Sequence, residues 1–114
     1  MTTMNLRNKV QLIGHIGNSP EMKTTENGKT LAKFSLATNE SYYDSNGTQI
    51  TNTQWHNIVA WGKTADVAKS LLTKGKEVLV EGKLNTREYE NNEGKKQRIT
   101  EIVAQQLLVF GKKN

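Results

Sequence analysis

A single helical segment interrupts a chain that otherwise alternates like β-strands. Residues 63–74 have apolar side chains at helical spacing, with Thr64 as the expected N-cap and Gly75 as the stop. Asp66 favours the positive end of this helix, and the expected apolar stripe consists of Val67, Ala68, Leu71 and Leu72. Strand patterns lie on both sides, so the expected order is strand, strand, strand, helix, strand, strand.

Five segments alternate polar and apolar residues with the period of two that a half-buried strand requires. They cover residues 9–16, 30–38, 54–61, 77–84 and 98–110. Asn27-Gly28 before the second segment is a hairpin signal, and Gly17-Asn18-Ser19-Pro20 is a turn. Residues 40–53 are polar around Ser45-Asn46-Gly47, and a second polar stretch centres on residues 91–94. We therefore expect two long hairpin arms.

The order of elements favours an all-β fold with one helix, and specifically a five-stranded Greek-key OB-fold barrel with long β-hairpin arms. A small β-sandwich is the alternative, but it has no use for a helix between its third and fourth strands. A length of 114 residues suits one hydrophobic core and excludes a second. Residues 1–114 are therefore expected to form one OB-fold domain.

Composition excludes several classes of protein. The chain has no cysteine, which removes a disulfide framework, a thiolate zinc site and a cysteine nucleophile together. The N-terminus lacks the apolar core of a signal peptide, and no apolar run approaches the roughly 20 residues that span a bilayer. We expect a soluble, cytoplasmic protein with no membrane partner. Sixteen Lys and Arg against 11 Asp and Glu leave a net charge of +5, which favours an anionic partner only weakly.

Two tryptophans share one face of an expected strand. Trp55 and Trp61 are six residues apart, or roughly 20 Å in a regular strand. Asn57 lies on their face, where a polar residue is tolerated only if exposed, and the opposite face has His56, Ile58 and Ala60. The tryptophan face is therefore expected to be the outer one. Val59 lies between the tryptophans, so a core position for both remains the alternative.

The remaining aromatic residues divide between arms and core. Tyr42 and Tyr89 lie on the two arms among polar neighbours, and Phe34 and Phe110 have parities that suit a core. On the second arm, Arg87 shares a face with Tyr89. The other face has Glu88 and Glu90, and the returning strand adds Lys95, Lys96 and Arg98. An ordinary solvated charged face is the alternative interpretation. Rings with interleaved cations on a β-surface are what single-stranded nucleic acid requires, because a duplex hides its base faces.

The sequence resembles the bacterial single-stranded DNA-binding proteins along nearly its whole length. The matching segments are Asn8-Lys9-Val10, Leu12-Ile13-Gly14, Gly17, Ser19-Pro20-Glu21, residues 34–41, residues 55–59, Gly62-Lys63, residues 65–68, Leu72, Lys74-Gly75, residues 80–84 and Thr86-Arg87. Many short matches in the same order and spacing make this resemblance specific.

The resemblance implies an OB-fold homotetramer that binds single-stranded DNA without sequence preference in replication, recombination and repair, with no cofactor and no catalysis. It implies stacking rings at Trp55, Trp61, Tyr89 and Tyr42, and it assigns no role to Tyr43. It implies contacts with the DNA backbone from Lys63, Lys74 and Arg87, and we add the nearby cations Lys96 and Arg98. His56 matches a residue associated with subunit contacts, and the protein is expected at the nucleoid.

Three departures from the family pattern change these expectations. Tyrosine replaces the usual tryptophan at two stacking sites, which keeps a ring of smaller area. The first arm has Glu40 and Asp44 and no cation, so we expect Tyr42 to act there without phosphate contacts. The sequence stops at residues 111–114, where relatives usually continue into a flexible linker and an acidic tip. It is either a DNA-binding core or a naturally short member, so recruitment of replication and repair proteins is not carried over.

Other classes of function fit less well. Residues 61–64 resemble the end of a phosphate-binding loop, but the required first glycine would fall at Asn57. His15 and His56 have no paired spacing, which argues against a metal site, and the scattered carboxylates argue against a nuclease. A primosomal-type OB-fold accessory or adaptor protein, acting mainly through protein contacts, is the remaining alternative.

Overall fold

Six strands and one helix account for most of residues 7–110, which are the part of the chain that the computed structural model describes. In chain order they are β1 (Val10–Ile16), β2 (Glu21–Thr24), β3 (Thr30–Tyr43), β4 (Gln49–Trp61), α1 (Gly62–Leu71), β5 (Glu77–Glu90) and β6 (Lys96–Phe110). The expectations about a leader segment and about the C-terminal end at residues 111–114 concern residues outside this range.

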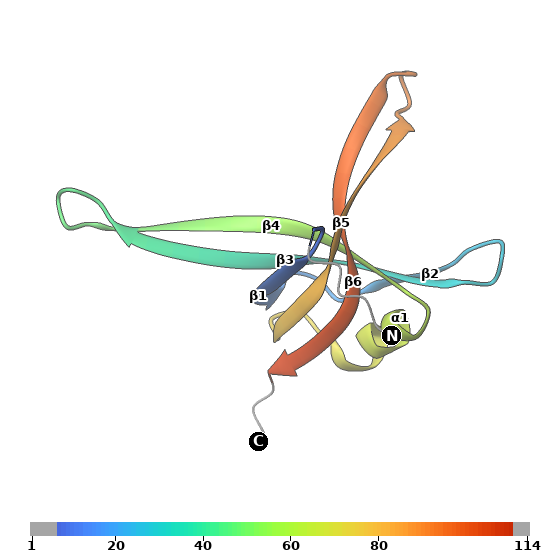
Figure 1. Cartoon of the computed structure of the whole chain (residues 1–114), viewed down its shortest axis with the longest axis horizontal. Helices are drawn as coiled ribbons and strands as arrows, with labels where there is room; N and C mark the ends of the chain where they lie inside the picture. Colours follow the sequence, from blue (N-terminus) through green and yellow to red (C-terminus); the bar gives the residue numbers. More distant parts are fainter. Residues whose placement is uncertain (1–6, 111–114) are drawn as a thin grey trace.

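The barrel closes through two pairings between strands that are distant in sequence (Figure 1). β1 pairs antiparallel with β5, β5 with β6, and β3 with β4. The parallel pair Ile58↔Ile102 joins β4 to β6, and the antiparallel pair Ile16↔Leu36 joins β1 to β3. β2, which the sequence patterns missed, pairs with β3 at the edge of this ring. The predicted five-stranded Greek-key OB-fold barrel is confirmed.

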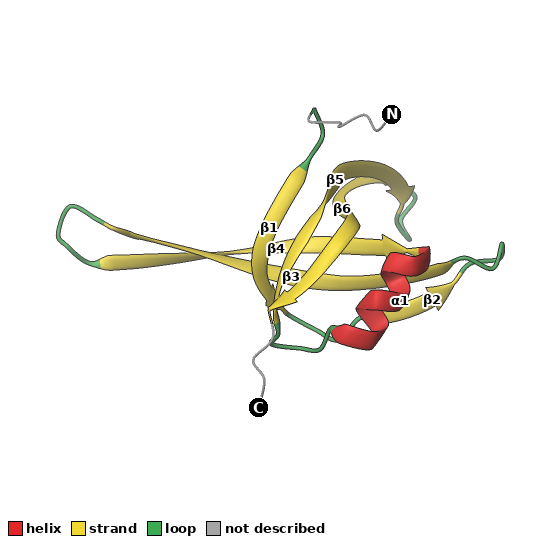
Figure 2. Cartoon of the chain, turned by 60° about the horizontal axis from the view of Figure 1, so that its bottom comes forward, coloured by secondary structure: helices red, strands yellow, loops and turns green. Residues whose placement is uncertain are grey.

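The core consists of the inward faces of the barrel strands together with one side of α1. Phe34, Ile58 and Val80 are among the strand residues that lie there, and burial of such side chains is the main favourable term in folding. α1 packs against β3, β4 and β6, as Figure 2 shows. Within residues 7–110, no helix is long and apolar enough to cross a bilayer.

The helix is shorter than predicted and begins earlier. Gly62, with φ of 58°, turns the chain from β4 directly into α1, so Thr64 lies inside the first turn and no side chain caps the helix. The buried side has Ala65, Ala68 and Leu72, whereas Val67 and Leu71 of the predicted stripe are exposed. The predicted stripe is therefore right for Ala68 and Leu72 and wrong for Val67 and Leu71, because the side of α1 that packs against the barrel runs through Ala65, Ala68 and Leu72.

Phe110 is exposed, contrary to its predicted place in the core, whereas Phe34 is buried as expected. The reason is a bulge in β6: Ala104 pairs with Gly82 and Gln106 with Glu81, which leaves Gln105 without a partner in the ladder. One extra residue reverses which side chains face the core beyond that point. Leu107 and Val109 then pack against the core, and Phe110 points outward.

Two hairpins continue past the barrel, as the polar stretches predicted. The first arm, residues 38–54, is the outer part of β3 and β4, and the second arm, residues 85–101, is the outer part of β5 and β6 (Figure 1). Their turns contain Gly47 and Gly94 at φ of 80° and 77°, a region that other residues adopt only under strain. Both arms therefore keep regular pairing to their tips.

Candidate nucleic-acid interface

Both tryptophans lie on the outer face of β4. Trp55 is 63% exposed and Trp61 is 42% exposed, while Ile58 and Ala60 on the opposite face are buried. The prediction about the faces is therefore confirmed, and the alternative of two core tryptophans is wrong. Val59 lies on the tryptophan face but is buried, because β6 lies alongside it at Val103. The six residues between the rings correspond to roughly 20 Å along the strand.

The ring of Trp55 lies against the backbone of the turn that follows β1. A Cβ added at Gly17 would come within 2.5 Å of Trp55 Cζ3 and of Ser35 Oγ, so only glycine fits beneath the ring. The turn is itself held to β3. Gly17 N–H donates to the Ser35 carbonyl at 2.9 Å, and Asn18 Oδ1 accepts from Ser35 Oγ at 2.6 Å and from Ser35 N–H at 3.0 Å. These contacts fix where Trp55 stands on the outer face.

A groove lies between this turn and Trp61. It consists of two adjoining hollows that share Lys33, Val59, Arg87 and Glu101. At one end Asn18, Ser35 and Asn57 line it, and at the other end Leu31, Trp61 and Asn85 do so. Beyond Trp61, a third hollow is lined by Thr25, Asn27 and Lys29 of the β2–β3 hairpin. The groove thus combines the Trp61 ring, an apolar floor and cations along one side of the barrel.

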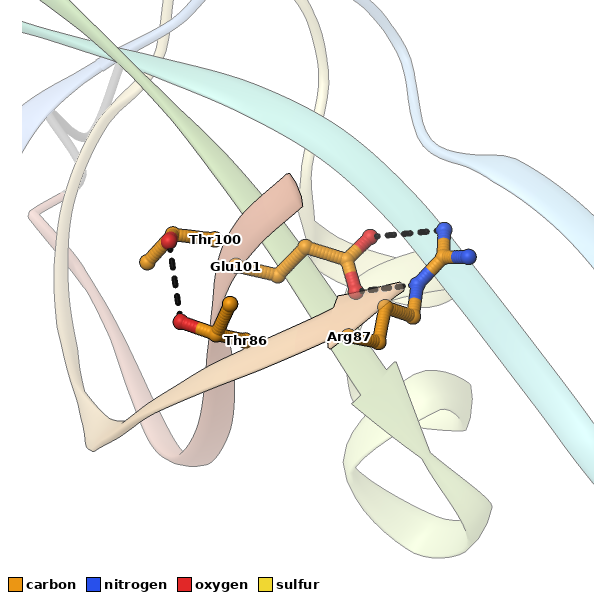
Figure 3. Close-up of polar contacts among 4 residues, drawn as sticks. All are labelled: Thr86, Arg87, Thr100 and Glu101. Carbon is orange, nitrogen blue, oxygen red and sulfur yellow. Dashed lines mark hydrogen bonds and ion pairs between the residues drawn. The ribbon is translucent and has the colours of Figure 1, made fainter. Parts of the chain in front are cut away.

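Arg87 lines both hollows of this groove. It binds the buried carboxylate of Glu101, as Figure 3 shows. Its Nε–H donates to Glu101 Oε1 at 3.0 Å and its Nη2–H to Glu101 Oε2 at 3.4 Å, next to a Thr86–Thr100 hydroxyl contact of 3.0 Å. Glu101 is only 6% exposed, and its hydrogen bond and its charge raise the pKa of Arg87 above the usual value. Arg87 is therefore always charged, but much of that charge is matched by Glu101.

The two faces of the second arm have different side chains: one has a cation and a ring, and the other has glutamates paired with cations. The guanidinium of Arg87 lies 5.9 Å from the centre of the exposed Tyr89 ring, which places the cation and the ring together as predicted. Arg98 is paired with Glu88 at 3.3 Å, and Lys96 stands opposite Glu90 in the ladder. Lys96 and Arg98 are thus on the glutamate face, so the structure does not bring them together with Tyr89.

The other predicted residues lie around this surface. Lys63 is in the first turn of α1, where it lines a hollow with Gln105 and Leu107, and Lys74 is exposed in the turn after α1. Neither lines the groove between the tryptophans. Tyr42 is exposed near the tip of the first arm. His56, half-buried on the opposite face of β4, has Nε2 3.0 Å from Thr38 Oγ1.

Sequence patterns missed Lys33 and Glu101, which line this groove, and Gly17, which packs against Trp55. Lys33 alternates with buried residues of β3, so its outer position could have been found from the period of two. Gly17 and Glu101 gave no such signal, because the reason for each is a contact with a residue far along the chain.

Comparisons with known proteins agree with this geometry. The model of the "Single-strand binding protein family" matches residues 7–110. The chain is 46% identical over 108 residues to "Single-stranded DNA-binding protein 1" of Chlorobaculum tepidum, covering 94% of this chain and 67% of that protein. It is 38% identical over 107 residues to the "Single-stranded DNA-binding protein" of Neisseria meningitidis serogroup A, covering 94% and 62%. The chain therefore spans about two thirds of the length of these curated relatives.

Solved structures show the same fold. One is "Plasmodium falciparum SSB complex with ssDNA", with a TM-score of 0.83 and 36% identity over 97% of this chain and 100% of that chain. Another is a deletion mutant of the single-stranded DNA binding protein from Thermus aquaticus, with a TM-score of 0.79 and 28% identity over 91% of this chain and 50% of that chain.

Proposed function

Because the chain belongs to the single-strand binding protein family, we propose that it binds single-stranded DNA with little sequence preference and protects it during replication, recombination and repair. The groove between the two exposed tryptophans is the observation that best supports this function. Unpaired bases stack on such rings, while Lys and Arg follow the phosphates. A duplex hides its base faces and would leave the rings unused.

In this proposal the rings of Trp55, Trp61, Tyr89 and Tyr42 stack on bases. Each engaged ring would contribute about 1–3 kcal/mol, with little dependence on the identity of the base. The phosphate contacts come from Lys63, Lys74, Arg87, Lys96 and Arg98, to which the position of Lys33 in the groove adds a further cation. These contacts give binding its dependence on salt.

The proposed function involves no catalysis and no cofactor, since stacking and ion pairing make and break no covalent bond. A nuclease would need several carboxylates converging on a divalent ion. Within residues 7–110 the structure has no group of three or more His, Cys, Asp or Glu side chains that could hold a metal ion. Incubation of labelled single-stranded DNA with Mg²⁺ tests this directly, and the expected result is intact DNA.

We further propose that the chain assembles as a homotetramer. Supporting this, Ile13, Leu79 and Leu108 stand side by side in the ladders of β1, β5 and β6, and Ile13 and Leu108 are largely exposed. A second copy that covers this apolar row would remove it from water. In this proposal, His56 also contributes to subunit contacts. Sedimentation at micromolar concentration measures the oligomeric state, and a monomer would contradict the proposal.

We also propose that the chain acts in the cytoplasm, at the nucleoid. The alternative of a primosomal-type adaptor acting mainly through protein contacts is not favoured, because the chain has exposed rings at all four expected stacking positions. Recruitment of partner proteins forms no part of the proposal.

Titration with oligo(dT), followed by tryptophan fluorescence, tests the proposed function. The titration is repeated at several salt concentrations and with a duplex of equal length as the control. We expect strong quenching by the single strand, little by the duplex, and an affinity that falls as salt rises. Absence of quenching together with absence of retained DNA would contradict the proposal and return the adaptor to consideration.

A further inference from the structure

Tyr43, to which no role has been assigned, is the most exposed large apolar side chain in the described part of the molecule. It is the last residue of β3, at the tip of the first arm, and 70% of its surface is open to water. Exposing a ring to this extent gives no folding advantage, because its apolar surface stays in water. The exposed position of this ring therefore indicates a role other than stabilising the fold.

The strand pairing places Tyr43 on the same face as the two tryptophans. β3 and β4 pair without interruption from Leu31↔Trp61 through Ala37↔Trp55 to Tyr43↔Gln49, so side chains directly opposite each other share a face. Side-chain contacts between opposite residues confirm this along the arm: Asn39 with Thr53 at 2.7 Å, and Ser41 with Thr51 at 3.1 Å.

The spacing along this face is regular. Six residues of β4 separate Trp61 from Trp55, and six more separate Trp55 from Gln49, the partner of Tyr43. Each step is roughly 20 Å in a regular strand. The three rings thus form a row that follows the twist of the ribbon from the barrel to the tip of the arm.

The charges on the arm favour this face for a polyanion. Glu40 lies on the other face, together with Tyr42, because both alternate with the residues that pair with Thr51 and Thr53. Between Tyr43 and Trp55 the tryptophan face has only the uncharged side chains of Asn39, Ser41, Gln49, Thr51 and Thr53. Asp44 is in the turn, where Oδ1 accepts from the Asn46 and Thr48 N–H groups.

We propose that Tyr43 is a further stacking site for single-stranded DNA, which extends the Trp61–Trp55 row to the tip of the first arm. The proposal rests on the proposed function, since it concerns the path of the same strand. The first arm then has a ring on each face, Tyr42 on one and Tyr43 on the other. Because the face has no cation, Tyr43 adds affinity without adding salt dependence.

Binding of oligo(dT) of increasing length by Tyr43→Ala tests this path. A short oligonucleotide that reaches only the groove between the tryptophans should bind as it does to the unchanged protein. A long one should bind about 5- to 150-fold more weakly, the equivalent of one lost stack, with the same slope of affinity against salt. Tyr43→Phe keeps the ring and should restore full affinity, and circular dichroism checks that both variants are folded.

A second measurement places a fluorophore at the site. In a chain with Trp55→Phe and Trp61→Phe, the substitution Tyr43→Trp leaves one tryptophan, whose emission should be quenched by long oligo(dT) and not by the short one. Wild-type affinity of Tyr43→Ala for every length, or an unquenched tryptophan at position 43, would overturn the proposal alone. A changed sedimentation coefficient of Tyr43→Ala with unchanged DNA affinity would also overturn it, in favour of a contact between copies. If the unchanged protein binds no oligonucleotide, the proposed function itself fails.

Discussion

The first and second arms leave the same barrel as antiparallel ribbons with the same kind of turn. The root of each arm, where it leaves the barrel, is however stabilised by a different interaction. At the root of the first arm, Trp55 packs closely against Gly17, a contact that involves no charged group. At the root of the second arm, Arg87 is bound to the buried carboxylate of Glu101. The first arm thus presents rings on an uncharged face, and the second presents a ring beside a partly neutralised cation.

Under the proposed function, the first arm supplies stacking without charge, whereas the second arm supplies a ring and a cation side by side. Stacking depends on ring area and is insensitive to salt, whereas phosphate pairing releases counterions and weakens as salt rises. A strand that lies across both arms would meet both kinds of contact. The variants below change one root at a time.

Removing the cation at the second root should have the largest effect, and the effect should be on stability. Arg87→Ala leaves Glu101 buried without a partner, which lowers the free energy of unfolding by about 2–3 kcal/mol. This is less than for a fully buried pair, because the Arg87 side chain is itself 44% exposed. Chemical denaturation measures the change. Arg98→Ala, which breaks the exposed pair with Glu88, is the matched control and should change stability by at most about 0.5 kcal/mol. Equal effects of the two variants would contradict the account of the second root.

Removing the ring at the first root should instead affect binding. Trp55→Ala should weaken binding of oligo(dT) by about 2 kcal/mol, because one stacking platform is lost. The thermal transition should hardly move, since the ring is largely exposed. Fluorescence titration and calorimetry measure the two quantities. A large loss of thermal stability with little change in affinity would show that Trp55 supports the barrel and not the DNA.

Moving the ring without removing it should have a smaller effect. Gly17→Ala places a methyl group too close to Trp55 Cζ3 and forces the ring from its preferred rotamer, which should weaken binding by about 1 kcal/mol. The tryptophan emission spectrum of the free protein should also shift. Ser19 lies in the same turn and is exposed, so Ser19→Ala serves as the control. If Gly17→Ala binds like this control, the turn does not position the ring.

The smallest expected effect is on the salt dependence. Glu101→Gln keeps the shape of the side chain and removes its charge, so the full charge of Arg87 becomes available to a phosphate. The slope of log affinity against log salt should then become steeper by up to about 0.7, the value for one contact with a single strand. Lys33→Met should make it shallower by about the same amount. An unchanged slope in Glu101→Gln would mean that Arg87 does not meet a phosphate.

Much of this surface could be predicted because strands alternate. The outer position of Trp55 and Trp61, the buried Ile58 opposite them, and the shared face of Arg87 and Tyr89 all follow from a period of two within one continuous strand. The same rule was wrong for Phe110, because the bulge at Gln105 inserts one residue and reverses the faces beyond it. The roles of these residues in binding DNA remain predictions.

By itself, the amino-acid sequence determined the order of the five barrel strands and the helix, the two arms and the outer face of β4, because these depend on neighbours within a few residues. Only the tertiary structure decided that Gly17 lies under Trp55, that Glu101 binds Arg87, and that Tyr43 joins the row of tryptophans. Closure of the barrel brings the turn after β1 to β3 and β4, and the pairing of β5 with β6 places Glu101 beside Arg87. Contacts of this kind join residues that no local spacing relates, so they appear only when the register of every strand is set.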